Sequence, residues 1–247
     1  MSSNRTAQLG RTDILKDHAD RCYFEERFMR LPKINADILN SSEATRMIAN
    51  TDFEIVGTNA TDADVTVNAG GGIVMETDGA PADQIIVVPH LDAGQSAWTG
   101  VTWGTSDSVS FGCVVKTDST LTDTIIWAGL KLTSEQDVGA DNDQVFWRYL
   151  DSYKSGNWTL ISSAKTGPVV DTETQTDVTV AASTEYKLEI KIGADRIPRG
   201  YINGVLKAEN PQLDADTNLL PCIGVEGDTG TAVTLNLRKI WISKAWG

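Results

Sequence analysis

The feature that most constrains this chain is a strict alternation of apolar and charged residues between Glu185 and Ile192. Every second residue from Tyr186 onward is apolar, and Lys or Glu lies between them. Successive side chains of a β-strand point to opposite faces of a sheet, so this period predicts a strand with one buried and one solvated face. Strands of a parallel sheet are covered on both faces and are apolar throughout, so the sheet is expected to be antiparallel.

A β-hairpin is predicted over residues 199–208. The pair Asn203-Gly204 lies between two short apolar runs. Both residue types tolerate the positive φ values that a type I′ turn requires, and the flanking runs therefore pair as antiparallel strands.

The C-terminal segment predicts a longer strand with one irregularity. Apolar residues alternate up to Leu237 and continue from Ile240 one residue out of phase, which an extra residue near Arg238-Lys239 explains as a β-bulge. Other short β-rich runs, separated by Gly, Asn, Asp and Pro, are 53–56, 64–68, 72–76, 84–88, 109–116, 124–132, 144–150, 158–162, 178–180 and 221–225. So many short strands predict an all-β domain, a two-sheet antiparallel sandwich over residues 51–247.

Residues 1–50 have a different character. They carry eight Lys or Arg against seven Asp or Glu, whereas residues 51–247 carry 13 against 27. Asp13 is a suitable N-cap for a helix over residues 14–30, in which apolar residues recur near helical spacing. A shorter helix is expected over residues 42–49. We therefore expect a partly helical N-terminal arm before the sandwich.

The arm is a candidate docking segment. It holds more apolar residues than one narrow helical stripe buries, and its arginines suit acidic groups on a partner. We expect it to fold against a neighbouring subunit or another protein of an assembly, through Arg21, Phe24, Arg27, Phe28 and Met29. The alternative is that the arm packs across its own sheet as a cover.

Three segments of the body also resemble a known fold family. A Trp-bearing run at Asn157–Ser162 precedes the strand containing Tyr186–Ile190 and the hairpin sequence Tyr201–Val205. This order resembles the C-terminal half of concanavalin A-like or laminin G-like jelly rolls, especially those of phage and other viral structural proteins. The resemblance covers residues 109–242 and implies a jelly roll more strongly than it implies a function.

Catalytic patterns are incomplete. Glucanases of this fold carry Glu-x-Asp-x-x-Glu, whose alternate carboxylates share one face of a strand. That pattern begins at Glu76, Glu135 and Glu226, but the last carboxylate is missing each time. The body has one histidine, His90, and no Gly-x-Ser-x-Gly turn for a nucleophilic serine. We assign no catalytic residue and expect a protein without enzymatic activity.

Metal sites are also poorly matched. The segment Asp214–Asn218 resembles the start of a calcium loop, but Leu219 stands where that loop needs Gly and Val225 where it needs Glu. Aspartates within residues 137–143 are an alternative calcium site, with solvated turns as the default. The three cysteines are far apart and form no Cys-x-x-Cys motif. We assign no metal ligand and no cofactor.

Two tryptophans are candidates for carbohydrate binding. Trp98 and Trp103 lie in a stretch rich in Gly, Thr and Ser, where an exposed indole could stack on a sugar ring. The alternative is that both pack in the core, as large aromatic residues commonly do.

Composition excludes two classes of partner. A net charge of −13 opposes nucleic-acid binding, which depends on clustered Lys and Arg. No run approaches the roughly 20 apolar residues of a membrane span, and the first residues lack the apolar stretch of a signal peptide.

The resemblance to viral jelly rolls implies a non-enzymatic structural protein of a virus or phage particle, and the lack of a catalytic set and of an export signal, the acidic body and the added near-neutral arm agree with this expectation. A capsid decoration or cement protein is the specific expectation, made in the host cytoplasm and located in the virion. Its expected partners are further copies of itself and the major capsid protein or another virion protein. The alternative is a carbohydrate-binding, lectin-like module on a viral fibre or spike, with a glycan as ligand.

Overall fold

Two β-sheets packed face to face make up the molecule, in a computed structural model that describes residues 21–29, 31–34, 52–89, 97–131, 144–164, 170–213 and 218–245. Each sheet contains eight strands within these residues. The described residues include one short α-helix, α4 (Ala97–Gly100), and two 3-10 turns, η1 (Asp62–Asp64) and η2 (Lys154–Gly156).

Sheet A is antiparallel. Its strands are β1 (Arg21–Glu26), β4 (Val65–Val67), β5 (Ile73–Glu76), β7 (Ser110–Thr117), β12 (Glu185–Ile192), β13 (Pro198–Ile202), β14 (Val205–Glu209) and β16 (Thr234–Ala245). They follow the order β14-β13-β12-β7-β16-β5-β4, and β1 also pairs with β16.

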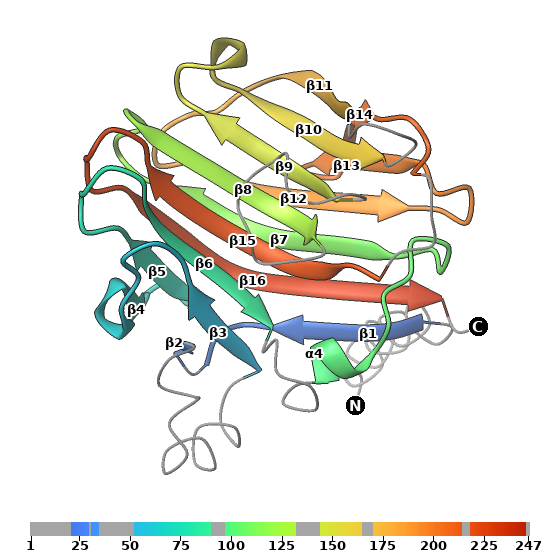
Figure 1. Cartoon of the computed structure of the whole chain (residues 1–247), viewed down its shortest axis with the longest axis horizontal. Helices are drawn as coiled ribbons and strands as arrows, with labels where there is room; N and C mark the ends of the chain where they lie inside the picture. Colours follow the sequence, from blue (N-terminus) through green and yellow to red (C-terminus); the bar gives the residue numbers. More distant parts are fainter. Residues whose placement is uncertain are drawn as a thin grey trace, which may run out of the picture.

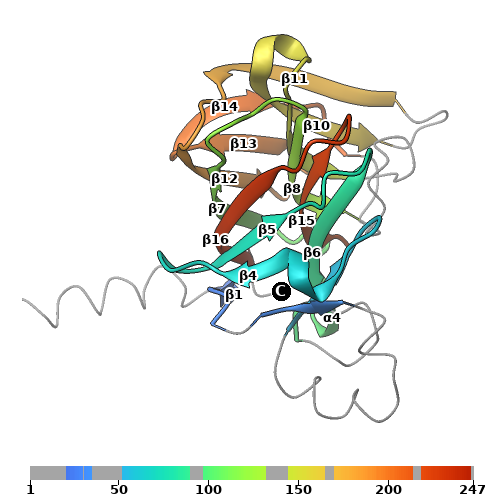
Figure 2. The same ribbon diagram turned by 90° about the vertical axis from the view of Figure 1, so that its left-hand side faces the viewer.

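Sheet B covers sheet A. Its strands are β2 (Lys33–Ile34), β3 (Phe53–Val56), β6 (Asp83–Pro89), β8 (Thr124–Lys131), β9 (Val145–Leu150), β10 (Asn157–Ala164), β11 (Val170–Thr179) and β15 (Leu220–Gly227). They follow the order β11-β10-β9-β8-β15-β6-β3-β2, and only the short β2–β3 pair among these described strands is parallel. The strands of both sheets run in similar directions (Figure 1), and a view from the side separates the two layers (Figure 2).

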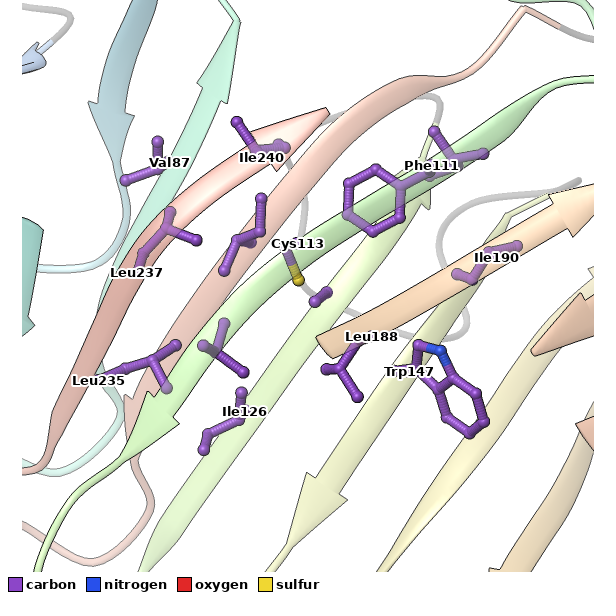
Figure 3. Packing of buried hydrophobic residues seen from close by; sticks show 14 of the residues in the cluster. Val87, Phe111, Cys113, Ile126, Trp147, Leu188, Ile190, Leu235, Leu237 and Ile240 are labelled. Atoms are coloured by element: carbon purple, nitrogen blue, oxygen red, sulfur yellow. The ribbon is translucent and has the colours of Figure 1, made fainter. Parts of the chain in front are cut away.

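The alternation between Glu185 and Ile192 has the predicted result. Every second side chain of β12, beginning at Tyr186, is buried in the main core, while Lys187 and Lys191 are exposed. In Figure 3, Leu188 of sheet A lies near Trp147 of sheet B, among buried residues from both layers. The core therefore fills the space between the inward faces of the two sheets.

The predicted hairpin and bulge are confirmed. Asn203 and Gly204 have φ values of 52° and 80° and join β13 to β14, as a type I′ turn requires. The pairing of β16 with β7 shifts between Leu237 and Lys239, which is the irregularity predicted from the change of phase.

The N-terminal helix prediction is wrong for the part of it that the structure describes. Arg21–Glu26 form strand β1, which pairs antiparallel with residues 240–245 of β16. β5 pairs with only residues 234–237 of the same strand, so β1 supplies backbone hydrogen-bond partners for the rest of that edge. Helix propensity is a weak preference that such pairing readily overrides. The shorter helix expected over residues 42–49 lies outside the described residues.

β1 also places aromatic side chains against the core. Phe24 lies 5.7 Å from Trp98 and 5.5 Å from Trp103 between ring centroids, and Phe28 lies 5.5 Å from Phe53. Phe53 in turn contacts Trp98 at 4.9 Å. These five rings form the aromatic cluster. Residues 21–26 therefore pack within the chain as a strand added to sheet A, and not as a cover lying across it.

The other residues predicted to bind a partner differ in whether they are used within the chain or lie at the surface. The guanidinium of Arg21 donates hydrogen bonds to Ser243 and to the carbonyl of Ser108, so it is used within the chain. Arg27 pairs with Glu25 at the surface, and Met29 is 87% exposed. Binding of a partner through this region stays a prediction.

A pair of neighbouring substitutions distinguishes packing from surface exposure. Phe28→Ala removes a ring that is 3% exposed and should lower the free energy of unfolding by about 3–5 kcal/mol, since it leaves a cavity. Met29→Ala removes an exposed side chain and should change it by no more than about 0.5 kcal/mol. Urea unfolding of both variants measures the difference, and equal effects would contradict the aromatic cluster.

Candidate functional site

The outward face of sheet B differs from an ordinary solvated sheet face. Antiparallel sandwiches usually present polar residues on their outer surfaces. Here a second cluster of buried apolar residues lies on the side of sheet B that points away from the main core: Ile86, Val88, Trp127, Phe146, Ile161 and Cys222. Each of these residues is 5% exposed or less, so this part of the face is covered within the folded chain.

Strand register places an arginine and a tryptophan side by side on this face. Arg148 of β9 pairs with Trp127 of β8, and Trp127 pairs with Gly224 of β15. A Cβ atom on Gly224 would lie 2.0 Å from Cζ2 of Trp127, so the indole occupies the space above a residue that has to be glycine.

Arg148 also belongs to a group of four polar side chains, which we call the Glu173 cluster: Arg148, Tyr153, Lys154 and Glu173. Nη2 of Arg148 donates to Oε1 of Glu173 at 2.8 Å, and the hydroxyl of Tyr153 donates to Oε2 at 2.6 Å. Nζ of Lys154 lies 3.8 Å from the same Oε2. Both cations also lie over the Tyr153 ring, with Cζ of Arg148 at 5.2 Å and Nζ of Lys154 at 5.1 Å from its centroid.

The turn that carries Tyr153 and Lys154 has an unfavourable backbone. Lys154, Ser155 and Gly156 have φ values of 50°, 58° and 66°, and left-handed conformations are costly for the two residues that are not glycine. The side-chain amide of Gln175 holds the turn by donating to the carbonyl of Lys154 at 2.8 Å. Figure 1 shows this turn joining β9 to β10 at one end of the sheet. Strain that neighbouring contacts maintain is a feature of functional sites.

Two nitrogen atoms on this face lack a hydrogen-bond acceptor among the described residues. They are Nε1 of Trp127 and Nε of Arg148, and both are shielded from solvent. A buried donor without an acceptor costs free energy, so native structures contain few of them. These two lie on paired positions of adjacent strands.

A separate carboxylate, that of Glu226, lies on β15 beside Gln84 of β6. Nε2 of Gln84 donates to Oε2 of Glu226 at 2.7 Å, and Oε1 of Gln84 accepts from the hydroxyl of Thr58 at 3.2 Å. Burial raises the pKa of Glu226 above its usual value, and the carboxylate of Asp228 raises it further.

The candidate carbohydrate-binding tryptophans are not on a surface. Trp98 is 3% and Trp103 is 1% exposed, and Nε1 of Trp103 donates to the carbonyl of Trp98 at 2.7 Å. The structure brings both into contact with Phe24, a candidate partner-binding residue. Core packing, the alternative considered for them, is what the structure shows.

Other residues considered from the sequence do not form a common site. Glu76 belongs to sheet A and Glu226 to sheet B, so these carboxylates do not share a strand face. His90 and the proposed calcium aspartates at 137–143 and 214–217 lie outside the described residues. Within the described residues, no group of three or more His, Cys, Asp or Glu side chains is placed to hold a metal ion. In the same part of the chain, no helix has the length and apolar character needed to span a membrane.

Sequence reasoning missed the Glu173 cluster. One signal was present, because Arg148 is a lone cation in an otherwise apolar strand with the sequence Val-Phe-Trp-Arg-Tyr-Leu. Charged residues are seldom placed in such a strand unless they are paired. Glu173 had no comparable signal, since β11 is polar along most of its length.

The fold is a concanavalin A-like jelly-roll sandwich, with two antiparallel sheets and almost no helix in the described residues. No family model and no curated protein matches the sequence. The structure is similar to that of a protein of unknown function from Shewanella oneidensis MR-1, with a TM-score of 0.58 and 10% identity, covering 99% of this chain and 95% of that chain.

Two further similar structures have described roles. The Emp47p carbohydrate recognition domain has a TM-score of 0.56 and 9% identity, covering 80% of this chain and 90% of that chain. A family 7 alginate lyase, A1-II′, solved with its product, has a TM-score of 0.50 and 15% identity, covering 75% and 85%. At these identities the similarity establishes the fold alone.

The raised pKa of Glu226 predicts a pH-dependent gain in stability for Glu226→Gln. Ionised Glu226 is less favourable in the folded chain than in the unfolded chain, so its cost appears as pH rises through the unfolded and then the folded pKa. The variant should have a higher Tm than wild type at neutral pH, and the difference should vanish below about pH 4.

Thermal unfolding at several pH values measures this, with Glu76→Gln as a control for the loss of one negative charge from an acidic protein. A gain in Tm that is the same at every pH would contradict the burial of Glu226.

Proposed function

We propose that this protein is a glycan-binding, lectin-like module that binds through the outward face of sheet B. The Glu173 cluster is the observation that carries the proposal. It combines one carboxylate with guanidinium, ammonium and phenol donors at fixed positions.

Such a set suits the hydroxyl groups of a sugar, each of which can donate one hydrogen bond and accept others. The side chains of Arg148, Glu173 and Lys154 are 15%, 21% and 34% exposed, so they are held in place and still reachable from solvent. The left-handed turn fixes Tyr153 beside them.

The similar structures are consistent with this proposal. One is a carbohydrate recognition domain, and another is an alginate lyase solved with its product. Because the identities are low, the argument for this chain depends on its own residues.

Binding without cleavage is part of the proposal. Glycoside hydrolysis generally needs two carboxyl groups on either side of the scissile bond, and the Glu173 cluster contains one. That carboxylate already accepts from Arg148 and Tyr153, an arrangement that favours recognition of a ligand over proton transfer to it.

The setting of the module is a further part of the proposal. A lectin-like module on a viral fibre or spike fits a glycan-binding face, whereas a capsid decoration role stays a prediction from the sequence. Measuring whether the chain is present on intact particles at a fixed copy number tests both settings.

A matched pair of variants tests the binding site itself. The Glu25 cluster on sheet A repeats the same groups, because Glu25 accepts from Tyr23 at 2.6 Å and from Arg27 at 2.5 Å and has Lys239 at 3.6 Å. Arg27 is 68% exposed, and this cluster lies on the other sheet. Glu25→Gln is therefore a control with nearly identical chemistry.

Glu173→Gln should weaken binding at least about tenfold, because it removes a charged acceptor, whereas Glu25→Gln should leave binding unchanged. A glycan array identifies ligands, titration calorimetry measures Kd, and a reducing-end assay on the same glycans should show no turnover. Failure to bind any glycan, or equal losses in the two variants, would overturn the proposal.

A further inference from the structure

We propose that a tetrahedral oxyanion group, a phosphate or a sulfate, binds on the outward face of sheet A at Arg21, Ser110 and Ser243. This site is separate from the Glu173 cluster, which belongs to sheet B, and it goes beyond the proposed glycan-binding function. The proposal is carried by a guanidinium that the chain holds in place without pairing it with a carboxylate.

Arg21 is held at a fixed position on the sheet. Its Nε donates to the hydroxyl of Ser243 at 3.1 Å, and its Nη2 donates to the carbonyl groups of Ser243 and Ser108. All three acceptors are neutral. Nη1 has no acceptor among the described residues and is not among their shielded atoms, so its N–H groups are reached from solvent.

The backbone at Ser108 supports this arrangement. Ser108 has a φ value of 52°, a left-handed conformation that is costly for a residue other than glycine. Its carbonyl is one of the acceptors that hold Arg21. Strain of this kind persists where surrounding contacts maintain it, and it is common at binding sites.

Arg21 differs from the other described arginines that hydrogen-bond through the guanidinium. Each of those arginines is paired with a carboxylate: Arg27 with Glu25, Arg148 with Glu173, Arg199 with Asp195 and Glu209, and Arg238 with Glu185. The chain has 34 Asp and Glu residues, yet the hydrogen bonds of Arg21 all go to serine oxygens.

A partly buried charge without a counter-charge is unfavourable. Burial lowers the pKa of the Arg21 guanidinium below its usual value, and no carboxylate opposes this effect. Guanidinium groups nevertheless stay protonated in proteins, so the positive charge persists at neutral pH. An anion bound at Nη1 would supply the missing counter-charge through a charge-assisted hydrogen bond.

Two serine hydroxyls complete the site. Ser110 of β7 pairs with Ser243 of β16, and both point away from the core because their neighbours Phe111 and Ile242 point into it. Side chains at paired positions begin about 5 Å apart. The guanidinium bonds to Ser243, opposite Ser110, and to Ser108, two residues before Ser110. It therefore lies beside the Ser110 hydroxyl.

Both hydroxyl groups have a proton to donate. The oxygen of Ser243 accepts from Arg21, which leaves its proton available, although the residue is only 6% exposed. The hydroxyl of Ser110 has no partner among the described residues. Donors from the three neighbouring strands β1, β16 and β7 (Figure 1) match the oxygens of a tetrahedral anion, whereas a carboxylate has only two oxygens.

The charges around the site also favour an anion. Lys191 lies opposite Ser110 on β12, is exposed, and has its Nζ 4.6 Å from the ring centroid of Tyr201. Asp107, next to Ser108, is already paired with Lys244 at 3.0 Å. This local surplus of positive charge attracts one oxyanion group, while the net charge of −13 opposes a densely charged polymer.

Titration calorimetry of the full chain with inorganic phosphate, inorganic sulfate and acetate tests the site, in a buffer without other oxyanions. Phosphate or sulfate should bind with a Kd of about 1 mM and at least about tenfold more tightly than acetate. The tighter of the two identifies the ester group that a larger ligand would carry.

Three variants and one control locate the binding. Arg21→Gln should weaken binding at least about tenfold, and Ser110→Ala about threefold without a change in Tm, because no described residue uses that hydroxyl. Ser110→Asp places a carboxylate beside Arg21, so it should abolish anion binding and raise the Tm. Arg199→Gln removes a cation from the same sheet and should leave binding unchanged. Ser110→Ala and Ser110→Asp keep the test decisive if Arg21→Gln fails to fold.

Three results would overturn the proposal. The first is no measurable binding of phosphate or sulfate to the wild-type chain. The second is acetate that binds as tightly as both, which would refute the tetrahedral class. The third is equal weakening by Ser110→Ala and Arg199→Gln, which would refute the location. None of these measurements uses a glycan, so their failure leaves the proposed function untouched.

Discussion

The register of the antiparallel strands decides which side chains reach each face of this sandwich. Because side chains alternate along a strand, a slip of one residue would turn every core residue outward. Trp147 points into the main core, and its neighbours Phe146 and Arg148 therefore point away from it. The same pairing sets Arg148 beside Trp127 and places the indole over Gly224. The core and the candidate site are consequences of one hydrogen-bonding pattern.

The site is built from features that do not favour stability. Two residues of the turn after Tyr153 other than glycine adopt left-handed backbone conformations, and Arg148 and Trp127 keep shielded donors without acceptors in the described structure. Each feature lowers the stability of the folded chain, and the apolar burial in the large core between the sheets offsets this loss. The Glu25 cluster on sheet A contains the same chemical groups.

The N-terminal segment shows how tertiary pairing overrides a local pattern. Residues 14–30 have apolar residues near helical spacing, yet Arg21–Glu26 also alternate, with Cys22 and Phe24 toward the core. Both readings are compatible with the sequence. The segment forms a strand because β5 leaves part of the edge of β16 unpaired, and β1 pairs with that part. As a strand it also places Phe24 against the rings of Trp98 and Trp103.

The sequence by itself determined the all-β class, the strand at Glu185–Ile192, the Asn203-Gly204 turn and the bulge near Arg238, because each depends on residues close together in the chain. Only the tertiary structure decided that Trp98 and Trp103 are buried and that Arg148, Tyr153, Lys154 and Glu173 meet. Those contacts join segments through long-range strand pairing, and period-two patterns specify which residues share a strand face but not which strands are neighbours.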